Sequence, residues 1–173
     1  MSDPFYARHF RRGEGVGWAC QNSYDFCLIL FPHSQFYRAM NTRATGTFEV
    51  KLSPQALTHQ YDDSLLARLS IDKTLHGDLA GTTTGEMLSA QTATQGSAGY
   101  VAIERVSGAL HGRAGTFALM HTGTMNRGEY GLSVIVVPDS GTGELTGLRG
   151  AFNIVIEDGK HSYIFDYTLD VAG

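Results

Sequence analysis

The sequence predicts an all-β fold, a closed or nearly closed antiparallel barrel of about eight strands with an irregular N-terminal extension. Three observations predict it. From Met40 onward apolar and polar side chains alternate with a period of two, a glycine-rich unit repeats, and hairpin signals separate the strands. Consecutive hairpins produce an antiparallel meander, and closure removes the edges through which sheets aggregate. We therefore expect a meander of the lipocalin kind that closes on itself.

The first 39 residues differ in character from the remainder. They are rich in aromatic side chains, follow the period of neither a helix nor a strand, and contain Trp18, Cys20 and Cys27. We expect residues 1–39 to be a poorly ordered extension, or to lie outside the physiological protein if translation starts at Met40. Residues 40–173 are expected to form the barrel domain. The two cysteines lack a histidine pair at ligand spacing, so they predict no zinc site.

The first expected strand carries Ala44, Phe48 and Leu52 on one face. Pro54 is expected to end it, and the segment 53–58 is expected to form a single helical turn with Ser53 as its N-cap. No longer helix is predicted.

The repeated unit is Gly-x-Leu-x-Gly-x-x-Gly-x-Phe. It runs from Gly108 to Phe117 and again from Gly143 to Phe152, an offset of 35 residues, and a looser copy starts at Gly77. Each copy is interpreted as a strand end, a tight turn in which glycine accepts positive φ, and a strand start with an inward apolar residue. Further hairpins are predicted at residues 126–128 and 158–159.

Composition excludes several classes of function. The chain has 13 basic and 17 acidic side chains and a net charge of −4, which gives no electrostatic reason to bind nucleic acid. No apolar run approaches the ~20 residues of a membrane span, so no membrane association is predicted and the expected location is the cytoplasm. Phosphate-binding, dinucleotide-binding, zinc-protease and calcium-loop motifs are absent. We therefore expect no cofactor and no metal.

Candidate site residues follow from which side chains point into the barrel. Phe152 and Ile154 form an inward row, and the repeat offset maps them onto Phe117 and Leu119, which places His121 on the same inward face. A second inward row is expected on the last strand, with aromatic side chains at Tyr163, Phe165 and Tyr167.

The strand over residues 100–106 allows two inward sets, one with Tyr100 and Glu104 and one with Val101 and Ile103. If Glu104 points inward, it can meet His121, and a carboxylate beside an imidazole in an apolar barrel suits general acid–base chemistry. Glu104 and His121 are therefore the candidate catalytic residues. The alternative is a buried polar pair that only satisfies itself.

A set of short motifs resembles a bacterial family, the domain-of-unknown-function 3224 family, over roughly Ala44 to Leu169. The motifs are Gly77-Asp78-Leu79, Gly85-Glu86-Met87-Leu88-Ser89-Ala90, Gly99-Tyr100-Val101-Ala102-Ile103-Glu104-Arg105-Val106, Leu110-His111-Gly112-Arg113, His121-Thr122-Gly123-Thr124-Met125 and Pro138-Asp139-Ser140-Gly141-Thr142-Gly143-Glu144-Leu145. The resemblance implies a small β-barrel like that of the allene oxide cyclases, in a family without an established activity. It implies no catalytic role for any residue here.

Three functions remain open. The first is binding of a small apolar or amphipathic molecule inside the barrel. The second is a cyclase or isomerase that acts on a hydrophobic substrate in the same cavity. The third is a structural or oligomerising barrel whose interior is filled, and a homo-oligomer is compatible with the sequence. The expected ligand-binding residues are Tyr100, Phe117, Phe152, Tyr163, Phe165 and Tyr167.

Overall fold

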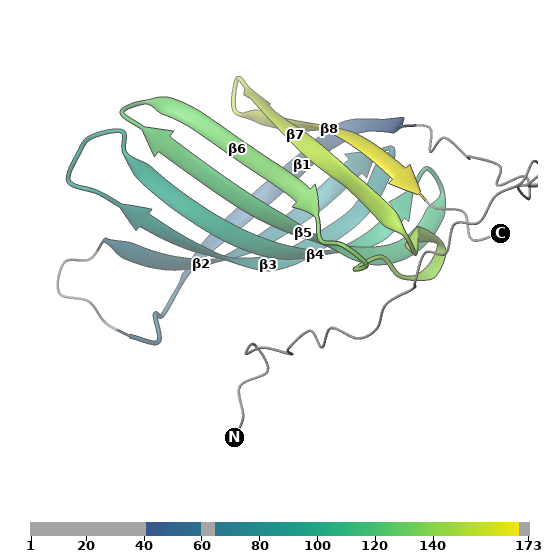
Figure 1. Ribbon diagram of the computed structural model, residues 1–173, viewed down its shortest axis with the longest axis horizontal. Coiled ribbons are helices and arrows are strands. Elements are labelled where there is room, and N and C mark those ends of the chain that lie inside the picture. The colour runs from purple at the N-terminus through teal and green to yellow at the C-terminus, as the bar shows by residue number, and fades with distance from the viewer. Residues whose placement is uncertain (1–40, 60–64, 170–173) are drawn as a thin grey trace, which may run out of the picture. The chain divides into compact units, whose positions relative to one another are not determined.

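The computed structural model describes residues 41–59 and 65–169, and these form a closed antiparallel barrel whose eight strands follow one another in chain order (Figure 1). The all-β barrel predicted from the sequence is confirmed. The predicted extension, residues 1–39, lies outside the described residues. The strands are β1 (Thr42–Gln55), β2 (Leu66–Gly77), β3 (Leu79–Gln91), β4 (Ala98–Leu110), β5 (Arg113–Asn126), β6 (Glu129–Val136), β7 (Leu148–Glu157) and β8 (Lys160–Leu169).

The predicted hairpins form with tight turns. Between β4 and β5, His111 and Gly112 have φ values of 47° and 82°, and between β7 and β8, Asp158 and Gly159 have φ values of 50° and 74°. Two successive residues with positive φ characterise the turn whose twist matches that of the flanking strands. The glycine of each pair adopts this conformation without the steric cost that a side chain would bring.

The leucines of the repeated unit close one end of the barrel. Leu79, Leu110 and Leu145 come from its three copies, and each is at most 1% exposed. The copies at Gly77 and Gly108 form hairpins. The copy at Gly143 instead forms a short 3-10 helix, η1 (Gly143–Leu145), in the connection from β6 to β7. The three copies of the repeat, in three separate connections, therefore cover one end of the barrel. We call it the closed end.

The predicted helical turn over residues 53–58 is wrong. β1 continues to Gln55, with Ser53 opposite Ser70 and Pro54 opposite Leu69 of β2. β8 pairs with β1 only from Thr42 to Phe48, so the later part of β1 has a neighbour on one side only. Proline is tolerated at such an edge because its missing N–H removes no ladder hydrogen bond.

Aromatic rings fill the half of the barrel next to the closed end. Phe165 is fully buried, and its ring centroid lies 4.0 Å from that of Phe152, 5.1 Å from that of Tyr167 and 6.1 Å from that of Phe117. These distances are those of packed aromatic pairs. No ligand can enter this half without displacing the rings.

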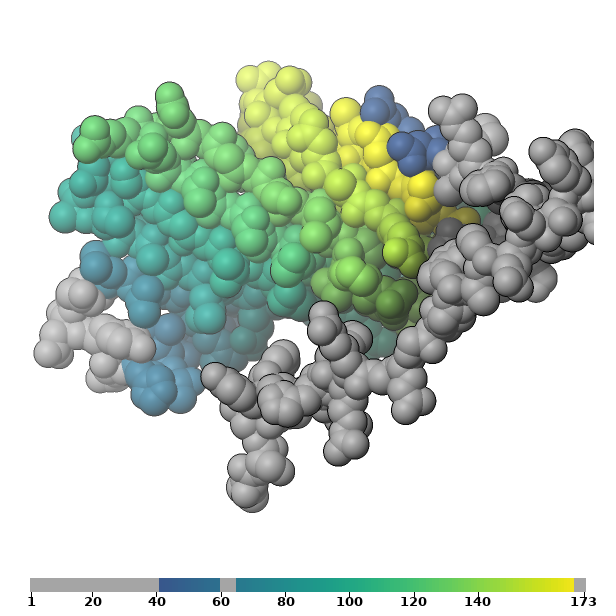
Figure 2. Space-filling view, viewed as in Figure 1, coloured from purple at the N-terminus to yellow at the C-terminus, as the bar shows by residue number. Residues whose placement is uncertain are grey.

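The opposite end of the barrel, which we call the open end, has inward-facing apolar side chains that solvent reaches. Strand alternation and cross-strand pairing place four large side chains on the inner face, and they are 39% to 60% exposed: Leu52, Met125, Tyr130 and Ile156. Strand β6 pairs with β7 through only two residue pairs, Val134 with Phe152 and Ile135 with Ala151. The β7–β8 hairpin consequently stands apart from the β5–β6 hairpin (Figures 1 and 2).

Candidate functional site

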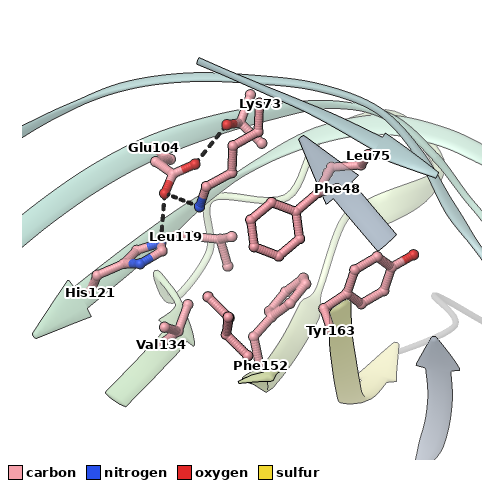
Figure 3. Close-up of a pocket in the computed structure, with 11 residues that line it drawn as sticks. Phe48, Lys73, Leu75, Glu104, Leu119, His121, Val134, Phe152 and Tyr163 are labelled. Carbon is pink, nitrogen blue, oxygen red and sulfur yellow. Dashed lines mark hydrogen bonds and ion pairs between the residues drawn. The ribbon is translucent and has the colours of Figure 1, made fainter. Parts of the chain in front are cut away.

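The structure settles which face of β4 points into the barrel. Ala102, Glu104 and Val106 are buried, whereas Val101 and Ile103 are about half exposed on the outer surface. His121 on the neighbouring strand β5 is also buried. Glu104 therefore points inward, which was the condition for its meeting His121. The two side chains point toward one another in the barrel interior (Figure 3).

Glu104 is the centre of an ionic cluster. The ammonium of Lys73 lies 2.6 Å from Oε1 of Glu104, and the hydroxyl of Thr83 donates a hydrogen bond of 2.6 Å to Oε2. Nε2 of His121 lies 3.0 Å from Oε1. Glu104 is fully buried and Lys73 is 10% exposed at its side chain. Charges so far from water persist only when they are paired, as these are.

Lys73 and Thr83 were not among the residues predicted from the sequence. The alternation of side chains along β2 and β3 could have indicated them, because it places Lys73 and Thr83 on the inward-facing rows of these strands. Lys73 stands between the buried residues Ile71 and Leu75 on β2, and Thr83 pairs with Val106 across β3 and β4. A lysine in an inward row is the pattern that points to a buried carboxylate partner.

His121 differs from the other members of the cluster. Its Nε2 atom is buried and lies 3.0 Å from Oε1 of Glu104, but within the described residues it makes no hydrogen bond of good geometry. It faces an internal cavity of about 20 Å³, enough for one water molecule. The cavity is lined by Phe48, Lys73, Leu75, Thr83, Glu104, Leu119, His121, Val134, Phe152, Ile154 and Tyr163.

Electrostatics keep Glu104 ionised. Burial by itself would raise the pKa of this carboxyl, but the neighbouring His121 and the ammonium of Lys73 outweigh burial and lower the pKa from 4.5 to about 2. Glu104 is therefore a carboxylate at neutral pH. In this state it orients its neighbours, and it is a poor proton donor.

Acid should weaken the barrel through this group. Because the pKa of Glu104 is lower in the folded chain than its ordinary value of 4.5, its contribution to stability is complete above that value and disappears as the pH falls toward 2. Between about pH 5 and pH 3, we expect the free energy of unfolding of the wild type to fall by roughly 2 kcal/mol more than that of the double variant Lys73→Met/Glu104→Leu, which lacks this carboxyl. Urea unfolding at both pH values measures it, and parallel losses in the two proteins would contradict the assignment.

The predicted ligand-binding aromatics separate into three groups. Phe152 and Tyr163 line the cavity. The hydroxyl of Tyr163 accepts a 2.9 Å hydrogen bond from the backbone N–H of Leu79, which holds the ring in place. The remaining residues do not line this cavity: Phe117, Phe165 and Tyr167 lie among the packed rings, and Tyr100 lies nearer the open end.

Tyr100 occupies its position because Gly123 lies opposite it on β5. A Cβ atom at Gly123 would come within 2.0 Å of the Tyr100 ring, so glycine leaves the room that the ring fills. Burial is the largest cause that raises the pKa of Tyr100, followed by its hydrogen bond with Tyr130. The phenol is therefore neutral at physiological pH and supplies a polar group near the open end.

A second hollow, of about 1010 Å³, lies outside the barrel. It is lined mostly by outward-facing residues of β2 to β5, among them Leu88, Val101, Ile103 and Met120, and by the connection that follows β1. Its charged side chains, Arg68 and Glu86, pair with each other. The surface of the hollow is mostly apolar, and its lining also includes Tyr100 and the buried His121.

Two features are absent from the described part of the chain. Residues 41–59 and 65–169 contain no group of three or more His, Cys, Asp or Glu side chains placed to hold a metal ion. No helix in the same residues has the length and apolar character needed to cross a membrane.

Comparison with known proteins identifies the family. The family model described as "Protein of unknown function (DUF3224)" matches residues 44–167, from β1 through β8. The chain belongs to this family. A crystal structure of a DUF3224 protein of unknown function from Shewanella oneidensis MR-1 is similar, with 48% sequence identity and a TM-score of 0.73. The match covers 77% of this chain and 100% of that one. No curated protein matches the chain.

Proposed function

We propose that this DUF3224 barrel binds a small amphipathic molecule whose apolar body lies in the open end and whose polar end reaches the cluster around Glu104. The observation that supports this most strongly is the buried Nε2 of His121, which faces a cavity without a hydrogen-bond partner among the described residues. An unpaired buried polar atom is costly, so a group that supplies the missing hydrogen bond binds favourably.

The size of the cavity determines how the ligand lies. About 20 Å³ admits the polar end of a molecule but not its body. The body has to rest against the apolar side chains of the open end, Leu52, Met125, Tyr130 and Ile156, which face inward and are exposed. Covering them would remove apolar surface from water, which drives binding.

The junction of β6 and β7 supplies a route. Only two residue pairs join these strands, whereas the whole of β4, from Ala98 to Leu110, pairs with β5. A junction with so few hydrogen bonds opens at lower free energy than the rest of the barrel. Its separation would widen the space around Phe152 and Ile154, next to His121.

A fluorescent probe tests the proposal in the full chain. N-phenyl-1-naphthylamine is neutral and amphipathic, and we expect it to bind with increased emission. Ile156→Glu, which places a charge at the open end, should weaken this binding by roughly tenfold or more. The matched control Ile103→Glu makes the same change on the outer face, in the hollow there. It should leave binding unchanged.

Two results would overturn the proposal. Loss of binding in Ile103→Glu but not in Ile156→Glu would place the ligand in the outer hollow. Absence of binding in the wild type, together with a ligand-free native mass spectrum of the gently purified protein, would favour a structural barrel with a filled interior.

A second candidate function is proton transfer on the bound molecule, as in a cyclase or isomerase. The closeness of His121 to Glu104 favours it, because a carboxylate beside an imidazole stabilises the protonated ring, which can donate its Nε2 proton to the bound molecule. The strongly lowered pKa of Glu104 assigns the proton-moving role to His121 and leaves Glu104 as its positioning partner. The likeness to allene oxide cyclases stays a prediction.

A further inference from the structure

Lys73 and Glu104, at the centre of the ionic cluster, balance each other's formal charge. One ammonium, on Lys73, and one carboxylate, on Glu104, lie 2.6 Å apart. Lys73 also lies 5.2 Å from the centroid of the Phe48 ring, a second favourable contact for its charge. Among the residues that line the cavity, those outside the group Lys73, Thr83, Glu104 and His121 are apolar or aromatic.

The polar groups of the cavity already have partners, with one exception. The hydroxyl of Thr83 donates to Glu104, and the hydroxyl of Tyr163 is bonded to the backbone of Leu79 and His76. Within the described residues, the buried side-chain atom left without a hydrogen bond is Nε2 of His121. A ligand that enters this cavity therefore meets the imidazole of His121 and a pair of charges that already neutralise each other.

The position of that atom also determines its role. Nε2 lies 3.0 Å from the carboxylate oxygen of Glu104, so a lone pair on Nε2 would be repelled, whereas an N–H there is attracted. This favours the tautomer of the neutral imidazole that carries its proton on Nε2. No hydrogen bond of good geometry joins this N–H to Glu104, so the N–H can be donated to an acceptor in the cavity.

From this arrangement we infer that the ligand is a neutral amphipathic molecule whose polar end is an oxygen acceptor, a ketone or an alcohol, bound by Nε2–H of His121. The inference rests on the proposed function. Because Lys73 and Glu104 lie 2.6 Å apart and neutralise each other, a carboxylate or an ammonium end gains little net attraction in this poorly solvated cavity to offset its own desolvation. A ketone or hydroxyl oxygen has a smaller desolvation penalty and accepts the hydrogen bond that His121 lacks.

A matched ligand series tests the inference in the full-length wild type at about pH 8. The series keeps an eight-carbon chain and changes only its end: octane, 2-octanone, 1-octanol, octanoate and octylammonium. Each competes with bound N-phenyl-1-naphthylamine, so the concentration that displaces half of the probe ranks their affinities. We expect the ketone and the alcohol to bind at least roughly tenfold more tightly than either ion. In His121→Leu, the advantage of the ketone over octane should disappear.

Each other outcome has a definite meaning. If octanoate or octylammonium binds as tightly as the neutral compounds or more tightly, the inference is overturned and the proposed function stands. If the probe binds and Ile156→Glu weakens its binding, but no octyl compound displaces it, the inference is overturned and the proposed function stands. If the probe does not bind, the proposed function fails with it. Should His121→Leu fail to fold, His121→Gln replaces it, and the ranking in the wild type still decides.

Discussion

Replacement of Glu104 by Gln is expected to lower the free energy of unfolding by about 3–5 kcal/mol. The change keeps the size of the side chain but removes its charge, which leaves the ammonium of Lys73 in the barrel interior without its carboxylate, 2.6 Å away in the wild type. Loss of one partner of a buried ion pair costs more than the pair contributes, because the remaining charge is poorly solvated. Chemical denaturation at neutral pH measures the difference.

Two comparisons make this result specific. Glu86→Gln removes the same charge from an exposed pair with Arg68 and should leave the unfolding midpoint close to that of the wild type. The double variant Lys73→Met/Glu104→Leu removes both buried charges and should recover most of the stability lost in Glu104→Gln. If Glu104→Gln unfolds at the wild-type midpoint, Lys73 is not confined as the structure shows.

Truncation of Phe165 to Ala is expected to cost about 3–5 kcal/mol. Phe165 is fully buried and packs against three other rings, so its removal leaves a void that the surrounding strands cannot close. The measurement is again the free energy of unfolding. Ile103→Ala, on the outer face where the side chain is about half exposed, is the control and should change stability little. A loss below about 1 kcal/mol for Phe165→Ala would mean that the packed half is not a rigid core.

The barrel was predictable from the sequence because its signals are local. Alternation places each side chain on one face, and turn residues such as Asp158-Gly159 mark where strands reverse, so strand order follows without knowledge of long-range contacts. The failure at residues 53–58 shows the limit of local signals. Ser53 and Pro54 have the local chemistry of a helix start, but pairing with β2 extends the strand through them.

The candidate site was predictable only in part. The repeat offset of 35 residues placed His121 inward, because the glycines of both copies fix the same register relative to the strands. The strand of Glu104 has apolar side chains on both faces, so alternation alone did not show which face points inward. The burial of its residues in the structure shows it. Lys73 and Thr83 come from β2 and β3, which lie next to β4, and their approach to Glu104 depends on the register in which these neighbouring strands pair, which alternation alone does not give.

The most direct test of this account is the ¹⁵N NMR signal of His121 Nε2 during titration with 2-octanone. In ¹⁵N-histidine-labelled protein, we expect this nitrogen to shift in a saturable way, because its N–H gains an acceptor. The signals of His76 and His161, whose rings do not line the cavity, should stay in place. A ligand that saturates the protein while the His121 signal remains unchanged would contradict the claim that the polar end of the ligand reaches the cluster.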